Sequence, residues 1–131
     1  MVFVAMKDDL DEEEERYVET ALISNVSKND IWIIDSGCTH HMTGDKEKFN
    51  TFEYYNGGTV RMGNDTPCLV EGKGTIILNN LIKCENAYWV KGMNYNILSV
   101  SQLNNSSHRV AFENKKAKIF NESGKLIGTG E

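Results

Sequence analysis

Ile31-Trp32-Ile33-Ile34-Asp35-Ser36-Gly37 is the stretch of sequence that decides the fold. A short apolar run bounded by turn residues predicts a β-strand. Such a strand anchors the carboxylate of Asp35 rigidly. The small hydroxyl of Ser36 can hydrogen-bond a neighbouring loop, and Gly37 permits a close approach because it has no Cβ. The stretch therefore predicts a buried strand that ends in an acidic loop.

Similar runs follow along the chain, spaced by about ten residues with Gly and Asn between them, which is typical of small sandwiches and barrels. These runs are Thr59–Met62, Cys68–Val70, Gly74–Leu78, Ala87–Val90, Arg109–Phe112 and Ala117–Phe120. We therefore expect a mostly β fold, a small closed β-barrel. One short helix is expected inside the core, over residues 99–104.

Two segments of turn-forming residues separate these runs. Gly63-Asn64-Asp65-Thr66 and Asn121-Glu122-Ser123-Gly124 contain the residue types that tolerate the positive φ angles of tight hairpins. Each segment predicts a hairpin between the runs that flank it.

Residues 1–30 differ from the rest of the chain. Asp8 to Arg16 are nearly all charged, and the apolar residues between Tyr17 and Leu22 recur at helical spacing. We expect an acidic leader over residues 1–30, either helical or disordered, and a folded domain over residues 31–131.

Composition narrows the classes of partner. The 131 residues suit one domain, and 14 basic against 19 acidic residues give a net charge of −5, without the positive surface that nucleic acid requires. No apolar run approaches the roughly 20 residues of a membrane span, and no signal peptide is recognisable. The three cysteines lack a close pair, so reduced thiols and a cytoplasmic protein are expected.

The acidic loop has the residue order of an aspartic protease. Two carboxylates held at about 3 Å share one proton, so one acts as base on a water while the other donates to the peptide carbonyl. The sequence contains a single Asp-Ser/Thr-Gly, so the second carboxylate has to come from another copy of the chain. The alternative is that Asp35 merely caps a turn after a strand.

Further residues in the same order carry a resemblance to a known family. They include Trp32-Ile33-Ile34-Asp35-Ser36-Gly37-Cys38-Thr39-His40-His41-Met42, Thr43-Gly44-Asp45, Phe49, Val60–Gly63, Gly72-Lys73-Gly74 with Ile76 and Leu78, Tyr88-Trp89-Val90 with Gly92, and Asn96–Leu103. Over residues 31–112 the chain resembles the protease region of copia-type retrotransposon Pol polyproteins, which are similar to retroviral proteases (retropepsins).

The resemblance implies a retropepsin-like aspartic endopeptidase that works as a homodimer on its own polyprotein, in the cytoplasm or in virus-like particles, without metal or cofactor. It makes Asp35 the catalytic residue, supported by Ser36 and Gly37. Asn96-Ile97-Leu98 resembles the retropepsin segment that packs beneath the active-site loop. Ser99 here occupies the place where retropepsins usually have glycine.

The segment Gly63-Asn64-Asp65-Thr66 is the candidate flap, a lid that closes over a bound peptide. Its place about thirty residues after Asp35 suits that role in the resemblance to retropepsins. The alternative is an ordinary surface hairpin.

Two hypotheses from other functional classes remain. Cys38, His40 and His41 invite a zinc site, but adjacent histidines of an extended chain point to opposite faces. We expect instead that one histidine packs or hydrogen-bonds near the acidic loop while the other is exposed. The second hypothesis is a catalytically silent β-barrel, left from a decayed element and serving as an interaction domain.

Overall fold

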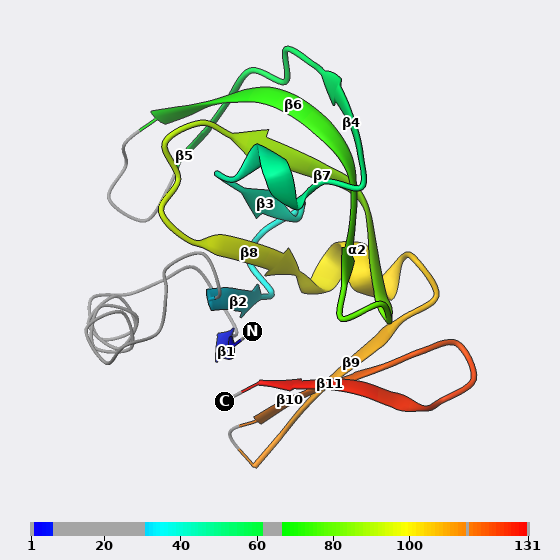
Figure 1. The fold of residues 1–131 in the computed structure, drawn as a ribbon. Helices are drawn as coiled ribbons and strands as arrows, with labels where there is room; N and C mark the ends of the chain where they lie inside the picture. Colours follow the sequence, from blue (N-terminus) through cyan, green and yellow to red (C-terminus); the bar gives the residue numbers. More distant parts are fainter. Residues whose placement is uncertain (1, 7–30, 62–66, 115, 131) are drawn as a thin grey trace.

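The computed structural model describes residues 2–6, 31–61, 67–114 and 116–130 (Figure 1). Within these ranges the chain is mostly β, as the sequence predicts. The strands are β1 Val2–Met6, β2 Ile31–Asp35, β3 Met42–Thr43, β4 Thr51–Tyr54, β5 Thr59–Arg61, β6 Pro67–Leu78, β7 Ile82–Val90, β8 Asn96–Ser99, β9 Arg109–Glu113, β10 Lys116–Phe120 and β11 Leu126–Gly130. The helix α2 covers Val100–Asn104, and a 3₁₀ turn covers Lys46–Lys48.

The strands form two sheets. The larger has the order β1-β2-β8-β3-β7-β6-β4, with β5 paired to β6, and the smaller has the order β11-β10-β9. In the described ranges β1 and β4 end the larger sheet and do not pair with each other. The prediction of a closed barrel is therefore wrong, because the sheet stays open and the smaller sheet packs separately on the core (Figure 1).

β2 lies inside the larger sheet. It pairs in parallel with β1 on one side and with β8 on the other. All five of its residues are buried, which explains why it reads as a continuous apolar run rather than an alternating one. Parallel neighbours on both sides hold the end of this strand, and with it Asp35, firmly in place.

β1 differs from what the sequence predicts for the start of the leader. Residues 2–6 form a strand in register with β2, from Val2 opposite Ile31 to Met6 opposite Asp35, and not a helix. This parallel pairing joins segments that are more than twenty residues apart, so no local sequence pattern predicts it. The rest of the expected leader, residues 7–30, lies outside the described residues.

β6 and β7 form the longest hairpin. Asn79 and Asn80 connect them with φ angles of 52° and 59°, as a tight hairpin turn requires. The sequence predicts two strands where β6 runs without interruption. Gly74 lies within this strand and does not end it. A Cβ at this position would lie 1.9 Å from the carbonyl oxygen of Thr51, so the glycine allows β4 to pair closely with β6.

Two apolar clusters fill the interior. The larger joins both sheets and α2; its buried members are Trp32, Ile34, Ile76, Leu78, Ile82, Cys84, Ala87, Leu98, Val100, Leu103, Ala117, Ile119 and Ile127. The smaller comprises Met42, Val70, Val90 and Ile97, with further half-buried side chains around it. β8 contributes to both clusters and β2 to the larger one, so these two strands form the structural centre of the domain.

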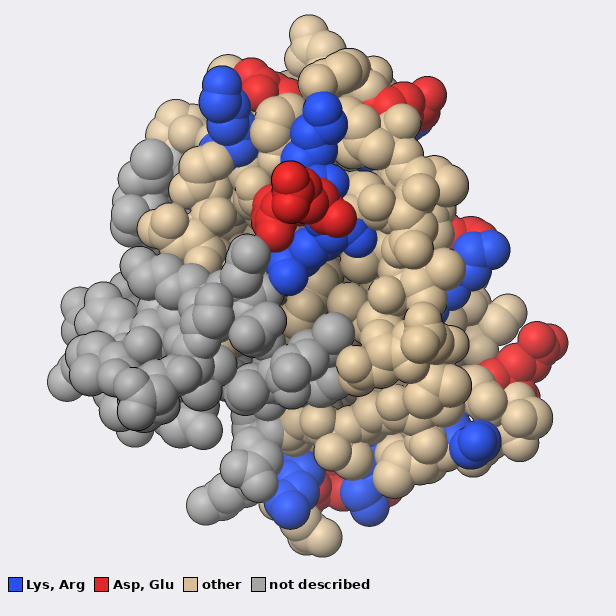
Figure 2. All heavy atoms as spheres, in the orientation of Figure 1, with Lys and Arg blue, Asp and Glu red and all other residues tan. Residues whose placement is uncertain are grey.

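Charged side chains alternate in sign on the face seen in Figure 2. Lys and Arg of the described residues lie beside Asp and Glu there, without a continuous basic stripe on that face. No helix in the described part of the chain is long and apolar enough to cross a membrane.

Candidate active site

Asp35 is the last residue of β2, and its carboxylate faces the loop that follows. The residue is 2% exposed. Its Oδ1 accepts a hydrogen bond from the Gly37 N–H at 2.7 Å, and its Oδ2 lies 3.4 Å from the Cys38 thiol, which donates to it. Ser36 and Gly37 are exposed. The loop thus presents a small exposed surface directly above a buried carboxylate.

β8 runs beside the strand that carries this carboxylate. Its register places Leu98 opposite Ile34 and Ser99 opposite Asp35. β8 lies between β2 and β3, although the chain passes directly from β2 through the acidic loop to β3 (Figure 1). The sequence-predicted residues 96–98 therefore lie beside β2, opposite Trp32–Ile34, and Ser99 is the residue opposite Asp35.

Asn96 connects the strands on either side of β8. Its Nδ2 donates to the Ile31 carbonyl oxygen at 2.8 Å, and its Oδ1 accepts from the Thr43 hydroxyl at 2.6 Å. Both side chains are buried, so each polar atom needs such a partner. Asn96 thereby fixes the two ends of the segment that contains the acidic loop.

His41 and the start of α2 hold the far end of the loop. The His41 Nδ1 accepts a hydrogen bond from the Ser99 N–H at 2.9 Å, and the His41 N–H donates to the Gln102 Oε1 at 2.6 Å. The Ser99 hydroxyl donates to the Cys38 carbonyl oxygen at 2.7 Å. The polar groups under the loop therefore form one connected network.

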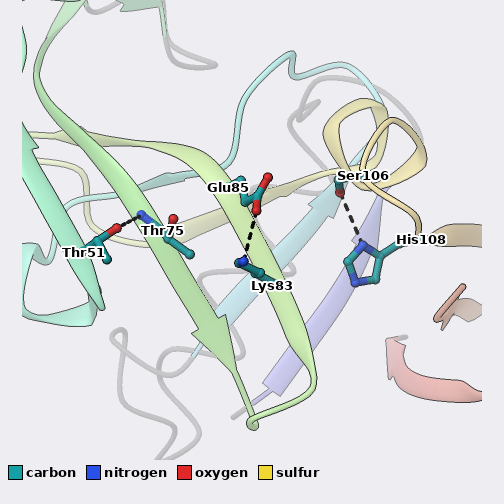
Figure 3. Close-up of polar contacts among 6 residues, drawn as sticks. All are labelled: Thr51, Thr75, Lys83, Glu85, Ser106 and His108. Atoms are coloured by element: carbon teal, nitrogen blue, oxygen red, sulfur yellow. Dashed lines mark hydrogen bonds and ion pairs between the residues drawn. The ribbon is translucent and has the colours of Figure 1, made fainter.

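Burial keeps the imidazole of His41 neutral. Desolvation, reinforced by the charges of His40 and His108, lowers the pKa of His41 from 6.5 to about 3. His108 follows α2, and its Nδ1 lies 3.3 Å from the Ser106 hydroxyl (Figure 3). His41 thus acts as a hydrogen-bond acceptor over most of the pH range.

The two adjacent histidines partly match the expectation for them. His41 is buried and hydrogen-bonded near the loop, as predicted. His40 is half-buried rather than exposed, because its ring stacks on Tyr88 with the centroids 4.1 Å apart. Desolvation lowers the pKa of His40 as well.

The hairpin of β5 and β6 lies close to the loop. It pairs Thr59–Arg61 with Pro67–Leu69, as the sequence predicts. Val60 and Cys68 of this hairpin and Cys38 of the loop pack against the same small apolar cluster. The candidate flap residues Gly63, Asn64, Asp65 and Thr66 lie outside the described residues.

The cysteines occupy different environments. Cys84 is buried in the large core cluster, where desolvation raises its pKa to about 12. Cys38 and Cys68 border the small cluster. Within the described ranges no group of three or more His, Cys, Asp or Glu side chains is arranged to hold a metal ion.

Comparison with known proteins identifies the family of this chain. Residues 32–108 match the family model described as the Pol polyprotein β-barrel domain. The chain belongs to this family. It is also 25% identical over 92 residues to the "Retrovirus-related Pol polyprotein from transposon TNT 1-94" of Nicotiana tabacum. That similarity covers 67% of the chain and 7% of the relative, so the chain corresponds to a small part of that polyprotein. No solved structure matches the chain.

The segment matched to the Pol β-barrel domain contains all side chains of the network around Asp35. It runs from the second residue of β2 through α2, and it ends before the three-stranded sheet of β9, β10 and β11. That sheet contributes Ala117, Ile119 and Ile127 to the large core. The family's common part therefore carries the candidate site, and the last strands cover its core.

Sequence reasoning missed the part of the site that depends on long-range hydrogen bonds. It did not predict the contact of His41 with Ser99, nor the thiol of Cys38 beside Asp35. One signal was present: Ser99-Val100-Ser101-Gln102 is a capping-box pattern that marks a helix start. Nothing in the sequence pairs that pattern with a histidine 58 residues away.

Proposed function

We propose that this chain is the aspartic endopeptidase domain of a retrotransposon Pol polyprotein, active as a homodimer. The observation that supports it best is the position of Asp35. A carboxylate is held at the end of a fully buried strand, with the exposed Ser36 and Gly37 above it and β8 beside it. A carboxylate that only caps a turn needs none of this support.

The proposed chemistry uses two copies of Asp35. In the dimer the two exposed loops meet, and the carboxylates share one proton because two close negative charges repel each other. The ionised carboxylate takes a proton from a water, which attacks the peptide carbonyl, and the protonated carboxyl donates to the carbonyl oxygen. Neither step needs a metal or another cofactor.

Each of the other predicted residues has a proposed role consistent with its place. Ser36 and Gly37 form the surface on which the loops meet. Asn96 joins β2 to β3, and Ile97 and Leu98 form the strand that supports the loop. The β5–β6 hairpin lies against the same small cluster as the loop, which suits a flap that covers a bound peptide.

The proposed substrate is a polypeptide, the polyprotein of which the domain is a part, and the proposed place of action is the cytoplasm or virus-like particles. The proposal includes no direct contact with nucleic acid or membrane. Cleavage should be greatest on the acidic side of neutrality, with a bell-shaped pH profile, because the dyad is active with a single proton.

A subunit-mixing experiment tests the proposal. Wild-type chain is mixed with an equal amount of Asp35→Asn chain at a concentration where both dimerise, and cleavage of a peptide library is measured. Activity per wild-type chain should fall to about half, because random pairing places half of the wild-type subunits in dimers with one carboxylate.

Asp45→Asn provides a matched control. Asp45 also accepts a hydrogen bond from a backbone N–H two residues ahead, that of Glu47, but at the exposed start of the 3₁₀ turn. Because its Asp35 is intact, mixing in this variant should leave activity per total chain unchanged. If the Asp35→Asn chain has no effect on a wild type that cleaves, the site lies within one chain. If a folded wild-type dimer does not cleave at any pH, the domain is a silent interaction module.

A further inference from the structure

His41 occupies an unusual place in the capping of α2. Ser99 is the N-cap of this helix, and its hydroxyl accepts from the Gln102 N–H at 3.1 Å. In an ordinary capping box, the side chain three residues after the N-cap returns to bond the N-cap N–H. Here the Ser99 N–H donates to the His41 Nδ1, and the Gln102 side chain accepts from the His41 N–H. His41 is thus inserted into the capping box.

This insertion ties the acidic loop to the helix at two points. The Ser99 hydroxyl holds the Cys38 carbonyl oxygen, three residues after Asp35, and the Ser99 N–H holds the ring of His41. Ser99 is also the register partner of Asp35 across β2 and β8. Any movement of the loop away from β8 therefore breaks bonds to the residue beside the carboxylate.

Packing alone does not explain why residue 41 is a histidine. With Nδ1 accepting, the neutral ring carries its hydrogen on Nε2. That nitrogen is buried and has no hydrogen-bond partner among the described residues, and His41 as a whole is 1% exposed. An apolar side chain of similar shape would fill the space without an unsatisfied donor. Such an apolar side chain could not, however, accept a hydrogen bond from the Ser99 N–H.

We infer that His41 is a positioning residue for Asp35, whose neutral ring latches the loop of residues 36–41 to the start of α2. The inference rests on the proposed protease function for its effect on the reaction. The latch itself is a set of hydrogen bonds that exists in the folded chain whether or not the chain cleaves peptides.

Protonation of His41 would break the hydrogen bond from the Ser99 N–H, because an imidazolium has no acceptor nitrogen. The titratable groups whose charges act on the ring are His40, next to it in the loop, and His108, which follows α2. Both oppose a positive charge on His41. An enzyme that works in acid, as proposed, gains from an acceptor that stays neutral there.

Three variants test the inference. His41→Leu fills the space but offers no acceptor, whereas His41→Asn places a neutral amide oxygen near the position of Nδ1. His40→Leu is the matched control, since that ring stacks on Tyr88, bonds its neighbour Thr39 and accepts no hydrogen bond from the start of α2. Cleavage is measured as kcat and KM, and the exchange rate of the Ser99 amide hydrogen is measured by NMR.

The expected result for His41→Leu is a fall in kcat of about 10- to 100-fold with KM nearly unchanged, because the reacting group is misplaced while the peptide surface stays intact. His41→Asn should restore most of kcat and slow Ser99 exchange again. His40→Leu should change neither. A purely structural role for His41 predicts that stability falls and kcat per folded molecule stays the same, which would overturn the inference.

The wild type alone provides a second test if His41→Leu does not fold. The nitrogen chemical shifts of the ring should show a neutral His41 with hydrogen on Nε2, and the Ser99 amide should be protected from exchange. A ring with hydrogen on Nδ1, or a rapidly exchanging Ser99 amide, contradicts the latch. If these signals are as expected but the wild type cleaves nothing, the latch stands and the proposed protease function fails.

Discussion

Two turns of this molecule use the same hydrogen-bond pattern in different surroundings. After β2, the Asp35 Oδ1 accepts from the Gly37 N–H at 2.7 Å. Between β10 and β11, the Asn121 Oδ1 accepts from the Ser123 N–H at 3.1 Å. In each turn the side chain bonds the backbone two residues ahead, which is a common use of Asp and Asn. The turn geometry alone therefore does not distinguish a catalytic aspartate from a structural one.

The surroundings of the two turns differ. The turn at Asn121 lies at the end of a peripheral hairpin, and the residues that follow Asn121 in it, 122–125, are exposed (Figure 1). The turn at Asp35 follows a fully buried strand, borders β8 and is held by Asn96 and His41 through long-range bonds. Burying a carboxylate opposes stability, because a charged group loses its hydration. Such support is what the proposed catalytic role of Asp35 requires, because a reacting group has to be held in a fixed position.

The largest expected effect comes from exchanging the two side-chain types. Asp35→Asn keeps an oxygen for the Gly37 N–H but cannot act as a charged base, so cleavage should fall by at least about 100-fold while the fold persists. Asn121→Asp keeps the corresponding acceptor and should leave cleavage unchanged. Peptide cleavage rates and circular dichroism of both variants measure this contrast. Equal loss of activity in the two variants would mean that Asp35 has no special role.

The next effect concerns the residues that anchor each turn. Ile34 precedes Asp35 and is 0% exposed, whereas Leu126 follows the Asn121 turn and is 45% exposed. Ile34→Ala should lower the free energy of unfolding by about 3 kcal/mol, since it leaves a cavity in the core. Leu126→Ala should change it by less than about 0.5 kcal/mol. Urea unfolding of the two variants measures the difference, and similar values would show that β2 is not the more tightly packed element.

Much of this contrast was accessible from the sequence. The apolar run ending at Asp35, the turn at residues 121–124 and the helix start at Ser99 are local patterns, and the structure confirms each. Turns and strand ends are predictable because a few neighbouring residues determine them.

The parts that the sequence did not predict depend on distant pairing. β1 joins β2 across more than twenty residues, and His41 meets Ser99 across 58. The prediction of a closed barrel was wrong for the same reason, because the spacing of strands in a sequence does not specify whether the last strand pairs with the first. Such contacts follow from the assembled sheet and leave little local trace.

A different effect should appear in the pH dependence of stability. The pKa of His41 falls from 6.5 to about 3 on folding, so between these values the unfolded chain binds a proton that the folded chain does not. The stability contributed by the neutral ring is complete above pH 6.5 and is lost as pH falls toward 3, with a slope of about 1.4 kcal/mol per pH unit.

His41→Asn removes this titration, because an amide binds no proton in that range. Urea unfolding of wild type and variant at several pH values should give two lines that differ in slope below pH 6.5 and run parallel above it. Parallel lines throughout would mean that His41 is protonated as easily in the folded chain as in the unfolded one. The amide turn at Asn121 offers no comparable titration at its acceptor.

The smallest effect belongs to the peripheral turn itself. Gly124 has a φ angle of 84°, a conformation that side chains with a Cβ rarely adopt, and its N–H donates to the Asn121 carbonyl oxygen at 3.0 Å. A Cβ added there meets no other atom within 4 Å, so backbone strain alone opposes Gly124→Ala. The substitution should lower the free energy of unfolding by about 1 kcal/mol. Because this turn lies away from the network around Asp35, cleavage measured below the melting temperature should be unchanged. A loss of cleavage with little loss of stability would show that the three-stranded sheet takes part in the reaction and does not merely cover the core.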